Sequence, residues 1–172
     1  EDLNALKRRA ETHKLNGDNA AAFQDFEVLA ALQPNVNLLL TCSEYHRKAG
    51  VISKAIKEAT AAINLSPENA LCYLARSKAY AAVFKAEDAI RDCSQSIHLD
   101  PMNASKAFSF RGQLLFKLQP KRALVDFSVS LMLDSDFSNI EARLYRGILY
   151  ESTGQFKVAQ KDFDEVVRLD AV

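Results

Sequence analysis

The sequence lacks an excess of charge of either sign, and it lacks a long apolar run. Lysine plus arginine number 22 and aspartate plus glutamate number 22, so the formal net charge is zero. A chain without a global positive field is not drawn to phosphate backbones or to anionic lipid, so we expect neither nucleic acid nor membrane partners. No apolar stretch reaches the length of a membrane span, and the opening residues "EDLNALKRRA" lack the apolar centre of a signal peptide.

The sequence also lacks a paired set of cysteines. Its three cysteines are Cys42, Cys72 and Cys93, and no two of them form a CxxC pair. An odd, unpaired set favours a reducing compartment over a disulfide framework, so we expect a cytoplasmic protein. Cys42 and His46 have the spacing of two metal ligands on one helix face, but no second pair completes four ligands. We therefore expect no metal site.

Motifs of catalysis are missing as well. There is no glycine-rich phosphate loop, no GxSxG string and no paired motif for a nucleophile and its base. We expect no enzymatic activity and no cofactor in this segment. Because the chain opens on Glu rather than Met, we expect it to be a piece of a longer protein.

What the sequence does contain is a repeat. The string "AIKEATAAINLSPEN" at 55–69 returns as "AIRDCSQSIHLDPMN" at 89–103, 34 residues later. Alanine recurs at spacings of 33, 34, 34 and 36, at Ala22, Ala55, Ala89, Ala123 and Ala159. Leucine recurs near the end of each apolar run that follows, at Leu32, Leu65, Leu99, Leu133 and Leu169. Pro34, Pro67 and Pro101 follow the first three leucines, and each predicts a helix end because proline has no N–H to donate.

A second helical pattern, with aromatic or leucine residues at spacings of three and four, precedes each recurring alanine. Short breaks such as "NGDNA" at 16–20 and "TGQFK" at 153–157 separate the two patterns, so each unit is predicted to be helix, tight turn, helix. A hairpin of this length cannot bury its apolar face alone, whereas stacked neighbours share one core. The sequence therefore predicts an all-α solenoid of about five stacked hairpins.

The pattern resembles the tetratricopeptide repeat, a 34-residue unit with an aromatic residue, Leu-Gly, Tyr, Gly-x-x-x-x-Ala, a second aromatic residue, Ala and Pro. The third copy keeps Tyr73, Tyr80, Ala89 and Pro101, with Phe84 in place of the turn glycine. The fifth keeps Gly147, Tyr150, Gly154, Ala159 and Phe163.

The resemblance covers nearly the whole chain and implies a right-handed superhelix with a concave groove. We expect a single array over 1–172, with repeats at 3–35, 36–69, 70–103, 104–137 and 140–172. Pentatricopeptide repeats, which read RNA and have a similar period, are the competing assignment. The glycine turns and Leu-x-Pro endings favour the tetratricopeptide family.

Arginine and aspartate recur in four of the repeats at a nearly constant separation. Arg9, Arg76, Arg111 and Arg146 lie in first helices, and Asp25, Asp92, Asp126 and Asp162 follow 15 or 16 residues later in second helices. We expect structural ion pairs within each hairpin, because regular repetition is what scaffolding requires. The alternative is a row of arginines that binds phosphate or carboxylate ligands. The second copy has Cys42 in place of the arginine, with Glu58 opposite.

The resemblance also implies that first helices line a groove for an extended peptide or a helix of a partner protein. In the N-terminal half, the inward positions are charged of both signs apart from one leucine, and they are Lys7, Glu11, Lys14, Leu40, Glu44, Arg47 and Lys48. The C-terminal half is more apolar, and the residues predicted to bind the partner are Leu71, Leu74, Lys78, Lys106, Gln113, Phe116, Leu144 and Ile148. The predicted function is a protein-interaction scaffold or adaptor.

Two alternatives stay open. The apolar residues of the groove can serve only internal packing or self-association, or the chain can be the regulatory arm of an enzyme whose catalytic domain lies elsewhere. A carboxylate clamp for the acidic tails of chaperones is not expected, because only Lys7 fits and Glu11, Thr41, Leu71 and Ala75 occupy the other positions. The last helix, which ends "VVRLDAV" without a polar capping helix, makes self-association through that end possible.

Overall fold

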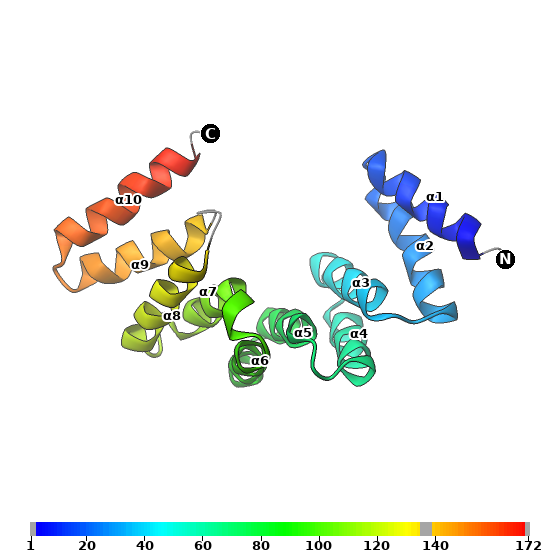
Figure 1. The fold of residues 1–172 in the computed structure, drawn as a ribbon, viewed down its shortest axis with the longest axis horizontal. Coiled ribbons are helices and arrows are strands. Elements are labelled where there is room, and N and C mark those ends of the chain that lie inside the picture. Colours follow the sequence, from blue (N-terminus) through cyan, green and yellow to red (C-terminus); the bar gives the residue numbers. More distant parts are fainter. Residues whose placement is uncertain (1–2, 135–138, 171–172) are drawn as a thin grey trace. The chain divides into compact units, whose positions relative to one another are not determined.

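The computed structural model describes residues 3–134 and 139–170. Within these ranges the chain forms ten α-helices and one short 3-10 helix, η1 (Figure 1). The helices are α1 (Leu3–Leu15), α2 (Asn19–Leu32), α3 (Val36–Lys48), α4 (Ile52–Leu65), α5 (Ala70–Ala82), α6 (Ala86–Leu99), η1 (Pro101–Asn103), α7 (Ser105–Leu115), α8 (Pro120–Leu133), α9 (Ile140–Ser152) and α10 (Phe156–Asp170). Each predicted repeat range holds two α-helices, which confirms the all-α solenoid.

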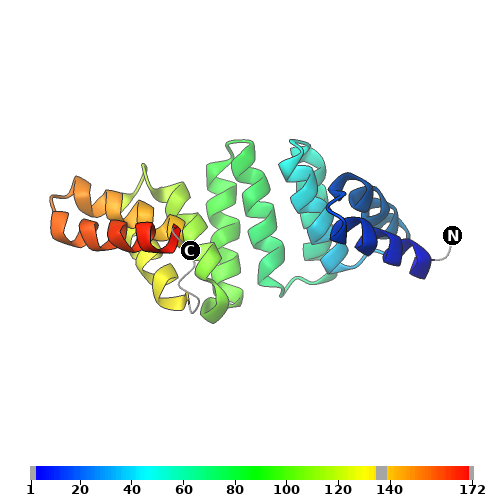
Figure 2. The same cartoon turned by 90° about the horizontal axis from the view of Figure 1, so that it is seen from above.

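The chain divides into two compact units, residues 1–85 with α1 to α5 and residues 86–172 with α6 to α10. In unit 1, α1 pairs with α2 and α3 with α4, and α5 packs against α4 and α3. In unit 2, α7 pairs with α8 and α9 with α10, and α6 packs against α7 (Figures 1 and 2). The right-handed superhelix and a single groove along the whole chain stay predictions.

Side chains that accept backbone N–H groups mark several helix starts. Asp18 accepts from the N–H of Ala21 and caps α2, and Asn35 accepts from the N–H of Leu38 and caps α3. Such caps satisfy donors that have no partner within the first helical turn. Local chemistry therefore sets where these helices begin.

Three of the turns inside the hairpins contain a glycine in the left-handed conformation. Gly17, Gly50 and Gly154 have φ angles of 78°, 78° and 75°, values that glycine adopts without a steric penalty. Phe84 stands in the equivalent turn with a φ angle of 59°, and it is 95% exposed. A bulky residue in this region is strained, so the α5–α6 connection keeps the turn of the repeat at a cost in backbone energy.

Small side chains fill the contact between paired helices. All five recurring alanines are buried, which lets the two helices of a hairpin approach closely. Larger apolar residues then form separate clusters, one with Leu6 and Leu29, one with Leu39 and Ile63, and one with Leu115, Phe127 and Leu149. A core distributed over successive hairpins is what a repeat fold requires.

Candidate functional site

Three of the predicted arginine and aspartate pairs come together as two-bond links between paired helices. Arg111 donates from Nε to Oδ2 of Asp126 at 2.8 Å and from Nη2 to Oδ1 at 2.8 Å. The pairs Arg9–Asp25 and Arg146–Asp162 have the same arrangement, with distances of 2.6 to 2.8 Å. These hydrogen bonds raise the pKa of Arg111 and Arg146 and lower the pKa of Asp25. The aspartates are buried, so these arginines are occupied inside the hairpins.

The fourth predicted pair has its members in different units. Arg76 lies on α5 of unit 1, where its guanidinium lies over the rings of Tyr73 and Tyr80 and Nη1 donates to Oγ1 of Thr60 at 3.5 Å. Asp92 is buried on α6 of unit 2. An ion pair between Arg76 of unit 1 and Asp92 of unit 2 stays a prediction.

In the α3–α4 hairpin, a buried histidine replaces the arginine link. His46 Nδ1 lies 2.8 Å from Oε2 of Glu58 and its Nε2 lies 3.4 Å from Oε1 of Glu27, while its ring edge meets Phe23. Burial raises the pKa of Glu58 above its ordinary value, although the hydrogen bond from His46 opposes this. Burial, with the charges of Glu58 and Glu27, raises the pKa of Cys42 to about 12. The sequence pattern placed Glu58 opposite Cys42, but its polar partner is His46, one helical turn further along α3.

The residues predicted to bind a partner in unit 1 have different environments. Leu71 is exposed and Lys78 is half-buried, but Leu74 is only 7% exposed. The expectation that Leu74 faces a groove is therefore wrong. Periodicity placed it on the inward stripe of α5, but α3 and α4 both pack against this helix and cover the position.

In unit 2, the residues predicted to bind a partner also differ in how exposed they are. Lys106, Leu144 and Ile148 are exposed. Phe116, directly after α7, is half-buried, and its ring meets the edge of Tyr145 with centroids 5.2 Å apart. Gln113 donates from Nε2 to Oε2 of Glu141 at 2.9 Å. Phe116 thus contributes packing between α7 and α9, while Leu144 and Ile148 present apolar surface.

Unit 1 has a groove that the sequence interpretation did not single out. Of the described residues, those of α1 and α3 do not pack closely on each other, whereas α2 packs against both helices and forms a floor between them. Two adjoining hollows of about 770 and 650 Å³ occupy this space, and Phe26 of α2 and Thr41 of α3 line both. We call the two hollows together the α1–α3 groove.

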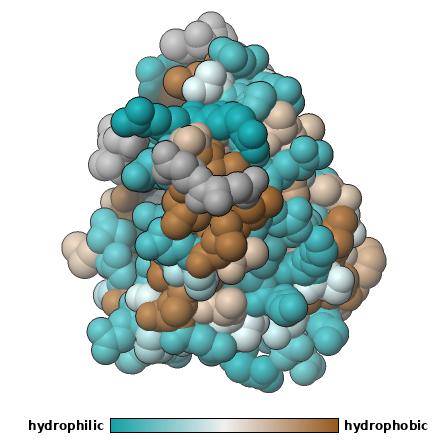
Figure 3. Space-filling model, turned by 90° about the vertical axis from the view of Figure 1, so that its right-hand side faces the viewer, coloured by the Kyte–Doolittle hydropathy of each residue, from teal (hydrophilic) through white to brown (hydrophobic). Residues whose placement is uncertain are grey.

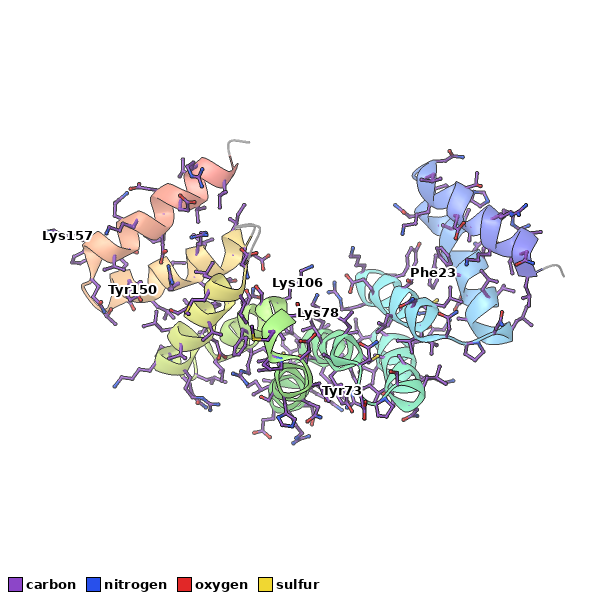
Figure 4. The ribbon with its side chains drawn as sticks, viewed as in Figure 1. Phe23, Tyr73, Lys78, Lys106, Tyr150 and Lys157 are labelled. Atoms are coloured by element: carbon purple, nitrogen blue, oxygen red, sulfur yellow. The ribbon has the colours of Figure 1, made fainter. Side chains whose placement is uncertain are left out.

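The groove combines an apolar floor with a charged rim. Its floor includes Phe23, which points from α2 toward α3 and stacks on Tyr45 with centroids 3.7 Å apart and planes at 6° (Figure 4). Lys14, Glu44 and Lys48 stand around the larger hollow. Two hydrogen bonds from Arg47 lower the pKa of Glu44, with a smaller effect of Lys78 and Lys48. The rim therefore carries fixed charges of both signs.

Lys14, Leu40, Glu44 and Lys48 were on the inward stripe expected from the sequence, but the aromatic floor was missed. Phe23 and Phe26 lie on the second helix of their hairpin and matched the pattern of core residues. A weak signal was present in the first turn of α2, "NAAA", whose small side chains leave room above Phe23 at the groove.

Figure 3 views the side of the molecule on which α1 and α2 lie, where apolar side chains gather in the middle and polar ones surround them.

The described residues offer little chemistry. No group of three or more His, Cys, Asp or Glu side chains within residues 3–134 and 139–170 is arranged to hold a metal ion. None of the helices in these ranges has both the length and the apolar character of a membrane span. At the C-terminal end, Val167 of α10 is exposed, and residues 171–172 of the predicted self-association end lie outside the described part of the chain.

Comparison with known proteins agrees with the repeat pattern. No model of a known protein family matches the chain. A heat shock protein sti1 homolog of Schizosaccharomyces pombe is 38% identical over 71 residues, which are 41% of this chain and 12% of that protein. The chain therefore matches only a small part of the length of this relative.

Solved structures match over nearly the whole chain. MamA from Desulfovibrio magneticus RS-1, residues 41 to its end, has a TM-score of 0.78 at 13% identity, over 99% of this chain and 97% of that one. TTC0263, a thermophilic TPR protein of Thermus thermophilus, has a TM-score of 0.77 at 18% identity, over 97% of this chain and 91% of that one. At such low identity, the likeness concerns the fold alone. The chain has the tetratricopeptide-repeat fold that its repeated motifs predict.

Proposed function

We propose that the chain is a protein-interaction module and that the α1–α3 groove binds a peptide or helix of a partner protein. The observation that carries this proposal is the groove itself, a hollow between α1 and α3 whose apolar lining includes the half-buried Phe26 and Tyr45. Concave sites with mostly apolar walls and a few fixed polar groups are the usual form of binding sites. The tetratricopeptide-repeat fold supports a scaffold role in general.

The groove favours a segment that offers one large apolar side chain and polar groups on either side. The apolar side chain would enter the larger hollow above Phe23, where burial of a single anchor contributes strongly to affinity. Lys14, Glu44 and Lys48 on the rim would then pair with polar or charged groups that flank the anchor. A charge of each sign around the anchor sets the orientation of the segment.

A second docking surface lies in unit 2, at Leu144 and Ile148 on α9. Their exposure one turn apart on the same helix supports the role expected from the sequence. We place Lys106 at the margin of this surface, and we assign Phe116 and Gln113 to the packing of α7 on α9. Substitution of both Leu144 and Ile148 by Glu tests this surface separately from the α1–α3 groove.

We propose a single array of five repeats in the cytoplasm, without catalytic activity of its own. The three cysteines are unpaired and buried, as in proteins of a reducing compartment. Glu11, Thr41, Leu71 and Ala75 stand where a carboxylate clamp needs lysine or asparagine, which argues against a chaperone-tail adaptor. A structural segment of a longer array, or the regulatory arm of an enzyme, are the alternatives.

The test is a substitution that fills the α1–α3 groove and lies outside the buried core. Thr41 is exposed and lies where the two hollows meet, so Thr41→Trp would occupy the space of the bound segment. Thr12→Trp is the matched control, because Thr12 is also exposed and also donates to the carbonyl four residues earlier, but it lines neither hollow. Both variants should keep the helical circular dichroism of the wild type.

Affinity capture with mass spectrometry then compares the three proteins. We expect partners that are lost with Thr41→Trp and retained with Thr12→Trp, and chemical cross-links from these partners to α1 or α3. Identical partner sets for both variants would show that the groove is not the binding site.

A further inference from the structure

The turns of unit 2 gather on one edge of that unit. The helices α7 and α9 pack against each other, and each is followed by an antiparallel partner, so the α7–α8 turn and the α9–α10 turn lie at the same edge (Figure 1). We call the turn edge the exposed residues of these two turns and of the helical turns that follow, Lys117, Leu118, Lys121, Arg122, Phe156, Lys157 and Lys161.

Two large apolar side chains protrude from the turn edge. Leu118 is 67% exposed and Phe156 is 66% exposed. Phe156 is the first residue of α10, and Leu118 lies in the short turn two residues before α8 begins at Pro120, so neither side chain stands on a long loop. Large exposed apolar side chains on one edge of a unit mark an interaction surface more often than scattered single residues do.

Basic residues surround these two side chains. Among the described residues, no carboxylate lies within ion-pair distance of Lys117, Lys121, Lys157 or Lys161, and Arg122 donates only to Oε1 of its neighbour Gln119. Lys157 points away from the ribbon at the start of α10 (Figure 4).

The carboxylates nearest to this edge do not cancel the positive charge. Glu151 lies near the end of α9, and Asp162, Asp164 and Glu165 lie within four residues of Lys161 on α10. Asp162 is paired with Arg146, Glu165 is paired with Arg168, and Asp164 accepts a hydrogen bond from Gln160. The net charge of zero for the whole chain thus conceals a basic edge on unit 2.

We propose that the turn edge binds the surface of an anionic lipid bilayer, with Leu118 and Phe156 at the level of the headgroups and the lysines against the lipid phosphates and carboxylates. Basic residues beside exposed Phe and Leu are the combination that holds proteins at such surfaces. The proposal departs from the expectation, drawn from net charge alone, that membranes are not partners, and that expectation stays untested.

The shape of the turn edge favours a bilayer over a folded protein or a nucleic acid. Its apolar side chains protrude from tight turns, so a folded partner would need matching cavities, whereas a bilayer deforms around them. A single-stranded nucleic acid is bound through several aromatic rings that stack on successive bases, and this edge offers only Phe156.

The experiment is co-sedimentation of the protein with vesicles of phosphatidylcholine alone and of phosphatidylcholine mixed with phosphatidylserine. The apolar variant is Leu118→Ser with Phe156→Ser. Its control is Met132→Ser, since Met132 is 85% exposed near the other end of α8. The charge variant is Lys117→Gln with Lys121→Gln, and its control is Lys57→Gln with Arg8→Gln, two exposed basic residues that lie in unit 1 and line neither hollow of the groove.

We expect the wild type and both controls to bind only the vesicles that contain phosphatidylserine. Each edge variant should bind these vesicles more than about tenfold more weakly, because each removed lysine contributes about fivefold and each removed apolar side chain contributes at least as much. Circular dichroism confirms that all variants remain folded. Thr41→Trp should leave vesicle binding unchanged, which separates this proposal from the α1–α3 groove.

Equal sedimentation of edge variants and controls would overturn the proposal, as would a wild type that binds no vesicles. The same variants are tested with a single-stranded oligonucleotide and with polyglutamate. Binding of either polymer at the turn edge without vesicle binding would assign the edge to another polyanion and would also overturn the proposal.

Discussion

Replacement of Arg111 by methionine tests whether the recurring arginines hold the hairpins together. The guanidinium of Arg111 makes two hydrogen bonds to Asp126, donates from Nη1 to Oγ of Ser94 at 3.1 Å and lies over the ring of Phe108. Methionine keeps most of the apolar stem but removes all of these polar contacts. The carboxylate of Asp126 then stays inside the hairpin without its cationic partner.

The exposed fractions of the side chains set the expected magnitude. The Arg111 and Asp126 side chains are 16% and 6% exposed, so water cannot replace the lost partner. Removal of one member of a buried pair costs about 3–5 kcal/mol of unfolding free energy. The Arg9 side chain is 62% exposed, so Arg9→Met should cost less, about 1–2 kcal/mol, because water reaches that site.

Urea unfolding followed by circular dichroism measures both changes. The double variant Arg111→Met with Asp126→Leu should regain much of the lost stability, because no charge is then left unpaired. A loss smaller than that of Arg9→Met, or a double variant no more stable than the single one, would refute the reasoning. Loss of partner binding with unchanged stability would instead favour a ligand-binding role for the arginines.

Three further predictions concern stability. Phe84→Gly should raise the unfolding free energy, measured by urea titration, by about 1 kcal/mol, because the φ angle of 59° strains Phe84 and its exposed ring packs little. A decrease in the unfolding free energy would contradict this. Gly112→Ala should lower the melting temperature and reduce the unfolding free energy by about 1–2 kcal/mol, because the added Cβ would lie 2.7 Å from the fully buried ring of Phe127. A rise in melting temperature would show that the ring can shift. Burial raises the pKa of Glu58 above 4.5, so its contribution to stability is full below 4.5 and declines as the pH rises through the folded pKa. Glu58→Gln, which keeps an oxygen acceptor near His46, should reduce that decline in urea titrations at several pH values, and an unchanged decline would assign it to other groups.

The sequence was a good guide to the fold, because a helical repeat is written in local signals. Proline ends helices, glycine permits left-handed turns, and buried alanine marks close helix contacts, and each acts within a few residues of its position. The turn at Phe84 shows the strength of the pattern, since the stacked hairpins impose the left-handed conformation even where glycine is missing.

The candidate site was less predictable, because it depends on which helices separate and which pack. Leu74 and Leu144 occupy equivalent places on α5 and α9, yet Leu74 is buried and Leu144 is exposed. No pattern within one repeat distinguishes them, since the difference comes from the neighbouring hairpins. The hollow lined by Phe26 and Tyr45 also depends on the spacing of α1 and α3.

The sequence by itself determined the helical hairpins, their period, the turns and the resemblance to the tetratricopeptide repeat, because these depend on contacts between residues close in the chain. Only the tertiary structure decided that Leu74 is core, that His46 is the partner of Glu58, that the α1–α3 groove is open and that basic residues gather on the turn edge of unit 2. These features arise from packing between hairpins, where side chains more than a repeat apart in sequence compete for the same space.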